Sequence, residues 1–442
     1  MAMAYPEVAP HWELYEVHLD EAEYLDTQWE NALTAPDRYL GHVAQREARL
    51  LAHVDALALG GGEVSQRYLR PALAVEEAPR VSAAALALLL QEGTAGRDAV
   101  LAALTDGPPQ ALPGLQRALE LCGREDVLPA LTALLTPDTD PAVSAVALEV
   151  HAAHGRVPSV ALESWLVHPE PTVVAAACRV LPFMGTALPA PVLRQWTQAL
   201  ESSEPLVRDA ALASGAVLGL RAAWTRCLQV VEAREPSGRL PLLLLAQGGN
   251  TQEHARLMEL LDEPRSCVDA VWALGHGGRP EAVDACLRLL EDGHAGVARL
   301  ATESFASITG FPLEDAHLLL DEEPPEDASP AAPLLLEVEK TLPRASPEAA
   351  RAWWTRQREQ RRFAPGMRYL AGVPFSATAL VRSFATAPAR RWSALALELS
   401  IRSRGRHIVS ARDFSFRRHQ RLATVQGFAP RGEQPFSSLL HS

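Results

Sequence analysis

Residues that could bind a metal or take part in a reaction are few in this sequence. His151 and His154 lie three positions apart, which places both on one face of a helix, and His168 follows in the next segment. No acidic residue or cysteine completes a metal-ligand set near them. The motifs G-x-S-x-G, G-x-x-x-x-G-K-[ST], G-x-G-x-x-G and H-E-x-x-H do not occur. We therefore predict no catalytic residue, no metal site and no cofactor.

An arginine-rich stretch near the C-terminus is the strongest chemical feature. Pro343 to Arg421 contains 17 arginines and 4 acidic residues, a local charge of +13, whereas the whole chain carries −13. Arginines that alternate with tryptophans could contact phosphates and stack on bases. The acidic body offers the alternative that this basic segment docks on the same chain, on a second copy or on another protein. We favour a protein-facing surface over nucleic-acid binding.

Composition indicates a helical chain kept in a reducing compartment. Alanine and leucine dominate, aromatic content is 6%, and the five cysteines lack a C-x-x-C spacing. We expect buried free thiols. The N-terminal stretch has neither a basic nor an apolar leader region, and no run approaches 18 uncharged apolar residues. The prediction is a cytoplasmic chain without a membrane span.

The first 62 residues predict a helical hairpin. Apolar positions recur at spacings of 3 and 4 over 11–33 and again over 38–59, and Gly60, Gly61 and Gly62 end the second helix. His53 and Asp55 lie on that second helix. We expect His53 to pack or to form a hydrogen bond at the junction with the following segment, and Asp55 to face solvent.

Residues 63–310 predict a stack of helical hairpins. A glycine that ends the second helix of each pair recurs every 29 to 34 residues: Gly93, Gly123, Gly155, Gly185, Gly219, Gly248, Gly277 and Gly310. Self-similarity at that period is typical of repeat proteins. Pro113 and Pro241 lie where a regular copy has no proline, so the helices that contain them should start late or bend.

The composition changes after Gly310. Residues 311–346 are acidic and rich in proline at first, which favours a linker or strap. Residues 347–442 predict a separate basic domain with helices over 347–362, 376–385, 388–403 and 413–421, and a turn segment over 363–374. The tail from 426 to 442 is polar, and we expect it to be loose.

The repeat resembles the short HEAT repeats known from phycobilisome lyases. VRDAALASGAVLG matches that motif with Val207, Arg208, Ala210, Ala211 and Gly219 in the expected places. The resemblance implies an all-α solenoid of about eight HEAT-like hairpins, between the N-terminal hairpin and the basic domain. HLDEAEYLDTQW, REARLLAHVDALALGG and FAPGMRYLAGVP are similar to a proteobacterial family of HEAT-containing proteins whose genes often lie near type VI secretion loci.

HEAT arrays include enzymes as well as scaffolds. The HEAT-fold hydroxylase that modifies a translation factor binds two irons through His-Glu pairs, but this sequence has no His-Glu dipeptide. A bilin-lyase-like enzyme stays open, because that activity has no short motif to test.

The function we predict is a non-catalytic scaffold or adaptor for another protein, with an accessory role in a type VI secretion system as its specific form. The partner and the oligomeric state stay open. The predicted partner-binding residues are Arg208, Trp353, Trp354, Arg358, Arg361, Arg362, Arg368 and Tyr369.

Overall fold

The computed structural model describes residues 11–236, 238–291, 294–321, 337–360, 362–425 and 434–440. The chain is all-α and divides into two compact units. The first comprises Met1–Leu33, Gly41–Ala161 and Arg412–Arg417, and the second comprises Thr34–Leu40, Leu162–Ala411 and Arg418–Ser442. The predicted limits at 310 and 347 therefore do not coincide with the limits of these units, because most of the basic segment belongs to the second one.

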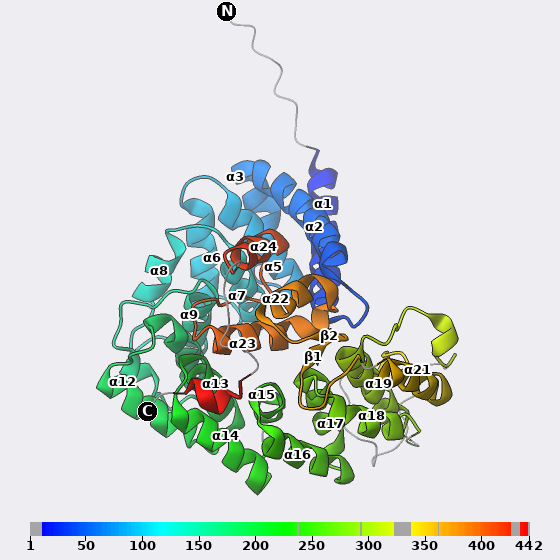
Figure 1. The fold of residues 1–442 in the computed structure, drawn as a ribbon. Coiled ribbons are helices and arrows are strands. Elements are labelled where there is room, and N and C mark those ends of the chain that lie inside the picture. Colours follow the sequence, from blue (N-terminus) through cyan, green and yellow to red (C-terminus); the bar gives the residue numbers. More distant parts are fainter. Residues whose placement is uncertain are drawn as a thin grey trace, which may run out of the picture. The chain divides into compact units, whose positions relative to one another are not determined.

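Helices make up most of the described chain (Figure 1). The helices up to residue 153 are α1 (Trp12–Thr34), α2 (Leu40–Leu59), α3 (Gly61–Val64), α4 (Arg70–Ala72), α5 (Ala78–Leu90), α6 (Ala95–Asp106), α7 (Leu112–Leu121), α8 (Val127–Ala133) and α9 (Pro141–Ala153). Those that follow, up to residue 309, are α10 (Leu162–Trp165), α11 (Pro171–Val180), α12 (Ala190–Leu200), α13 (Pro205–Leu218), α14 (Arg221–Ala233), α15 (Leu240–Gly248), α16 (Thr251–Glu259), α17 (Cys267–Gly277), α18 (Val283–Leu289) and α19 (Ala295–Thr309).

The C-terminal part adds shorter elements. They are α20 (Glu337–Lys340), α21 (Pro347–Glu359), α22 (Ala377–Thr386), α23 (Trp392–Arg402), α24 (Ser415–Ala423) and the antiparallel strands β1 (Tyr369–Leu370) and β2 (Val373–Pro374). The helices predicted over 347–362, 376–385, 388–403 and 413–421 are confirmed to within a few residues. None of the described helices combines the length and the apolar character that a membrane span requires.

The N-terminal hairpin forms as predicted. α1 buries Ala22, Leu25 and Trp29 on one side, at the spacing of 3 and 4 residues that the sequence indicated. His53 on α2 differs from its prediction: its Nδ1 lies 2.9 Å from that of His18 on α1, so its hydrogen bond joins the two helices of the hairpin and not the hairpin and the following segment. Asp55 is exposed, as expected.

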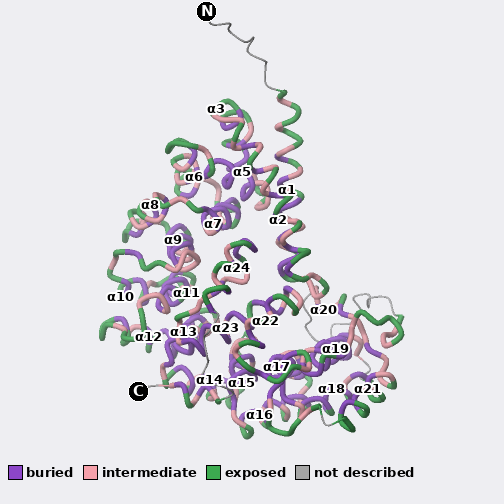
Figure 2. Tube along the Cα trace, turned by 45° about the horizontal axis from the view of Figure 1, so that its top comes forward, coloured by how far each residue is buried: buried purple, intermediate pink, exposed green. Residues whose placement is uncertain are grey.

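Alternate helices pack against one another along each unit. In the first unit α5 contacts α7 and α7 contacts α9, and in the second the contacts run from α11 through α13, α15 and α17 to α19. The helices in these series are largely buried, as Figure 2 shows for α5 and α17, and they form the core. A shorter, more exposed helix precedes several of them and packs alongside, as α12 does with α13 and α18 with α19.

The predicted glycine stops hold in most copies. Gly219 and Gly310 end α13 and α19 with φ of 74° and 76°, the left-handed conformation that glycine adopts without strain. Gly248 and Gly277 instead form the last residue of α15 and α17, and the next glycine ends each helix. The late starts predicted from proline are confirmed, because Pro113 and Pro241 lie in the first turn of α7 and α15.

The described residues of the predicted linker are packed. Leu319 pairs with Ala345 as an isolated bridge, and the backbone N–H of Ala345 donates to Thr302 on α19. Residues 322–336, the acidic centre of the predicted linker, lie outside the described residues. The tail differs from its prediction as well, since Phe436 is buried against Trp224 and over Gly248. Residues 426–433 and 441–442 are outside the described part.

Candidate functional site

Three charged side chains meet inside the second unit. Arg368 lies just before β1, while Glu398 and Arg402 are one turn apart on α23. Glu398 Oε1 lies 2.7 Å from Arg368 Nη1 and 2.8 Å from Arg402 Nε, and all three residues are buried. Burial raises the pKa of Glu398, but the two guanidinium groups outweigh it and hold the pKa below its usual value. The cluster therefore stays ionised within the core.

The same arginines complete the C-terminal ends of two helices. Arg368 donates to the backbone carbonyls of Gly277 (2.8 Å) and Gln247 (2.8 Å), and Arg402 donates to that of Gln247 (3.1 Å). The last carbonyls of a helix have no partner within the helix, and its dipole makes that end negative. A cation placed there both forms the missing hydrogen bonds and balances the dipole. Much of the basic C-terminal charge is thus used inside the chain.

A second buried network links α19 with the residues that follow it. Arg390 Nε lies 2.7 Å from Glu303 on α19, and Arg390 Nη2 lies 3.2 Å from Glu339 on α20. Arg239 contacts Glu339 as well, and it also pairs with Asp269 at 2.6 Å. Glu339 is fully buried, so its charge depends on these two arginines.

A cavity of about 330 Å³ lies beside this second network. Its apolar wall includes Phe311, Leu342, Leu370 and Leu395, contributed by four separate parts of the second unit. Its polar lining consists of Tyr39, Glu303, Ser307, Glu314, Ser383, Thr386 and Arg391. An apolar cavity of this size with a few polar groups is typical of a binding site for a small molecule or for a single side chain of a partner.

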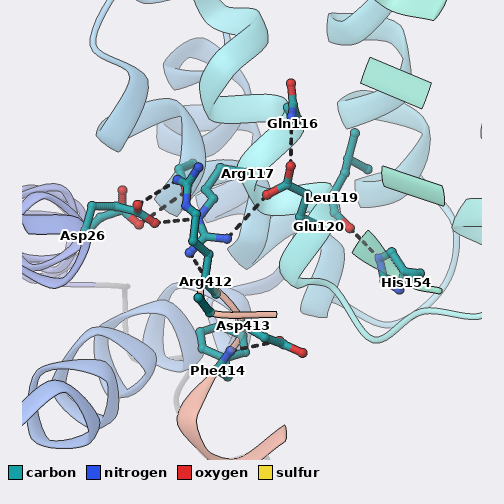
Figure 3. Close-up of polar contacts among 12 residues, drawn as sticks. Asp26, Gln116, Arg117, Leu119, Glu120, His154, Arg412, Asp413 and Phe414 are labelled. Carbon is teal, nitrogen blue, oxygen red and sulfur yellow. Dashed lines mark hydrogen bonds and ion pairs between the residues drawn. The ribbon is translucent and has the colours of Figure 1, made fainter. Parts of the chain in front are cut away.

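The first unit holds a charged cluster of its own (Figure 3). Glu30 on α1 accepts hydrogen bonds from Arg117 Nε (2.5 Å) and Arg412 Nη2 (2.7 Å). Asp26, one turn earlier on α1, is buried and accepts a hydrogen bond from Ser82 Oγ at 3.3 Å. Burial, with a further contribution from Glu30, raises the pKa of Asp26 from 3.8 to about 7, although Arg117 acts in the opposite direction.

The structure places four of the predicted partner-binding residues inside the chain. Arg208 is 2% exposed and pairs with Glu235, which follows α14, at 3.2 Å, so it joins two successive helical pairs. Arg368, Tyr369 and Trp354 are also buried. These four side chains form internal contacts, although Arg208 Nε and Trp354 Nε1 are buried without a hydrogen-bond partner.

The other four predicted residues differ in position. Trp353 packs edge-on against Phe305 and Phe311, so it faces inward as well. Arg358 and Arg362 are exposed. Arg361 lies outside the described residues. The tryptophans and the exposed arginines of α21 therefore do not share a solvent-facing surface.

The three histidines that could have formed a metal site have local partners. His151 Nε2 lies 3.0 Å from Thr132 Oγ1, and burial lowers the pKa of His151 to about 4. His154 Nε2 lies 2.9 Å from the carbonyl of Leu119, and His168 Nδ1 accepts from the backbone N–H of Glu170. All five cysteines are free and buried, as predicted. Within the described ranges, no three histidine, cysteine or acidic side chains are placed to hold a metal ion.

Comparison with known proteins assigns neither a family nor a function to this chain. No protein-family model matches the chain, and no curated protein matches its sequence. The candidate site therefore rests on the geometry of the chain itself.

Sequence reasoning missed the buried carboxylates. From the sequence, Glu303, Glu339 and Glu398 counted only toward the net charge. None of the three was named as a candidate site residue. Glu398 offered a signal, because it is the one acidic residue in the arginine-flanked apolar stretch RRWSALALELSIRS and has Arg402 four residues later. A lone acid on an apolar helix needs a buried partner.

Proposed function

We propose that this chain is a solenoid of HEAT-like hairpins that acts as a non-catalytic scaffold for another protein. The solenoid is supported by hydrogen bonds between residues that are separated in the sequence by about the length of one repeat. In a solenoid each repeat touches its neighbours at equivalent positions, so contacts should recur at that separation. Among the described residues up to Gly310, seven hydrogen-bonded pairs are 29 to 31 residues apart: Gln91 with Gly61, Arg97 with Asp126, Arg124 with Gly93, Gly238 with Asp209, Arg234 with Glu263, Arg239 with Asp269, and Arg279 with Gly249.

The observation that carries the scaffold proposal is an apolar stripe on α1. Leu14, Val17 and Tyr24 are 52%, 53% and 58% exposed, and their spacing places them along one side of the helix, away from buried Ala22 and Trp29. Large apolar side chains gathered on a solvated helix face mark an interaction surface. In the second unit, by contrast, the chain's own arginines cover the ends of α15 and α17. The partner is therefore expected on α1.

The charge around the stripe defines the partner. Glu13 and Glu16 are exposed beside its first turns, and Glu21 is half-buried between Val17 and Tyr24, whereas Arg46 and Arg49 on α2 line a surface pocket together with Tyr24. An amphipathic helix with an apolar face and a rim of lysine or arginine would match both features. Long-range attraction would also favour it, because the chain carries −13 overall.

Quantitative capture from the native cell tests this proposal. The full chain is compared with Val17→Glu on the stripe and with Val373→Glu, the same change at a valine that is 46% exposed on β2. Surface changes of this kind alter stability by about 0.5 kcal/mol or less, so both variants should fold. We expect a protein that wild type and Val373→Glu retain and Val17→Glu loses, and that contains a basic amphipathic helix. Identical sets of captured proteins for all three chains would refute the docking surface.

The accessory role in a type VI secretion system is the specific form of this proposal. It predicts that the protein lost with Val17→Glu is a component of that system. Its support is the sequence resemblance alone, so the identity of the captured protein decides it independently of the docking surface.

Nucleic-acid binding is the second candidate, supported by the exposed arginines of α21. Arg356 and Arg358 on α21 and Arg362 just after it are exposed and could contact phosphates, whereas Trp354 is buried and Trp353 packs against Phe305 and Phe311. A mobility shift of the full chain with single-stranded DNA at low salt, lost on Arg358→Gln, is the expected result. An unchanged mobility at low salt would exclude this function.

A further inference from the structure

The cavity beside α19 exposes parts of two charged side chains that are otherwise buried. Glu303 is 6% exposed and Arg391 is 7% exposed, and both line the cavity. Arg391 uses Nη2 for the carbonyl of Gly275 (2.9 Å) and for His276 Nδ1 (3.2 Å). Glu303 uses Oε1 for Arg390. Each head group is thus anchored on one side.

The remaining atoms of these two groups are unused. In the described part of the chain, Arg391 Nε and Nη1 donate no hydrogen bond and Glu303 Oε2 accepts none. None of these three atoms is among the fully enclosed unpaired ones, so they are accessible. A guanidinium edge and a carboxylate oxygen are therefore presented to the cavity without hydrogen-bond partners, although the opposite charges of Arg391 and Glu303 attract each other.

The polar end of a ligand for this cavity must carry both a hydrogen-bond acceptor and a hydrogen-bond donor. It must accept hydrogen bonds from Arg391, as a carboxylate does in charge-assisted pairs, and donate to Glu303, as an ammonium group does. An apolar group suits the rest of the ligand where it packs against the wall formed by Phe311, Leu342, Leu370 and Leu395. A volume of about 330 Å³ limits it to a small molecule.

We propose that this cavity binds a free α-amino acid with an apolar side chain. The carboxylate pairs with Arg391, the ammonium group pairs with Glu303, and the side chain packs against the leucines and Phe311. Binding leaves the anchoring contacts to Gly275, His276 and Arg390 in place, so the buried network does not need to rearrange. This ligand site is independent of the docking surface on α1.

Titration calorimetry on the full chain tests the proposal with L-leucine and L-phenylalanine as probes. N-acetyl-L-leucine lacks the ammonium group and L-leucinamide lacks the carboxylate. We expect at least one of the two amino acids to bind and both modified compounds to bind at least tenfold more weakly. Absence of binding by both amino acids would overturn the proposal, and so would equal binding of leucine and N-acetyl-leucine.

A matched pair of variants locates the site. Ala387→Leu places a larger side chain in the cavity lining, whereas Ala385→Leu makes the same change two residues earlier on α22, at an exposed position outside the lining. Binding should be lost in Ala387→Leu and kept in Ala385→Leu, while the circular dichroism melts of both stay near that of wild type. Because Glu303 also holds Arg390, Glu303→Gln is a supporting test only when its melt shows that it folds. Full binding by Ala387→Leu would refute the assignment to this cavity.

Discussion

Asp26 makes the stability of the first unit depend on pH in an unusual direction. Its pKa is raised from 3.8 to about 7, chiefly by burial, so the folded chain keeps a proton on this carboxyl group that the unfolded chain has already released above pH 4. The folded state then binds more protons than the unfolded state between about pH 4 and 7. The contribution of Asp26 to the unfolding free energy therefore falls as the pH rises through that window.

The substitution Asp26→Asn removes this loss, because the amide has a similar shape and does not ionise. Each pKa unit corresponds to about 1.4 kcal/mol, so a rise of about three units sets an upper limit of about 4 kcal/mol. We expect Asp26→Asn to match wild type near pH 4 and to be more stable by about 2–4 kcal/mol at pH 8. Asn can still accept the hydrogen bond from Ser82.

Urea unfolding followed by circular dichroism, at several pH values from 4 to 8, measures the effect. The difference between variant and wild type at each pH cancels the titration of all other groups to first order. Asp55→Asn, at an exposed position on α2, is the control and should show no pH-dependent difference. If Asp26→Asn is equally stable relative to wild type at pH 4 and pH 8, or is less stable at pH 8, Asp26 is ionised in the fold and this reasoning is wrong.

Two further predictions concern the second unit. Glu398→Gln leaves Arg368 and Arg402 buried without their counterion, and it should lower the unfolding free energy by about 3–5 kcal/mol in urea unfolding. The same change at Glu291, whose pair with Arg351 is exposed, should have little effect, and similar losses for both would contradict the role of the buried cluster. Gly278→Ala should cost more than the about 1–2 kcal/mol expected for left-handed alanine, because its Cβ would lie 2.2 Å from the carbonyl of Tyr369. Gly93→Ala also places alanine at a positive φ (75°), but nothing lies within 4 Å of its Cβ, so equal melting temperatures for the two variants would show that the contact with Tyr369 is unimportant.

The helices were predictable because their signals are local. The apolar spacing of α1, the prolines at the start of α7 and α15, and the glycines after α13 and α19 each act within one or two turns of the helix they define. Residues 160–167 show the limit of such signals, because their apolar positions form only the four-residue helix α10. Short apolar runs do not fix helix length.

The role of the basic segment was not predictable from the sequence, because it depends on contacts between distant residues. Arg368 caps carbonyls 91 and 121 residues earlier in the chain. An arginine that will cap a distant helix and one that will face solvent look the same in sequence, since both follow turns and both suit a polar environment. Arg358 and Arg368, ten residues apart, were given one predicted role, yet the first is exposed and the second buried.

The C-terminal end of α15 is capped by arginines that the ribosome adds long after α15 itself, and this affects how the chain folds during synthesis. The carbonyl of Gln247 receives Arg368 after 121 further residues and Arg402 after 155. At about 5–20 residues per second, the ribosome needs roughly 6–30 s to supply these two arginines. During that interval the nascent second unit carries helix ends without their partners, and a prematurely terminated chain keeps them so. Synthesis up to Arg402 is thus the step that supplies the missing helix caps of this unit, which would let chaperones and proteases distinguish chains that contain these arginines from shorter ones.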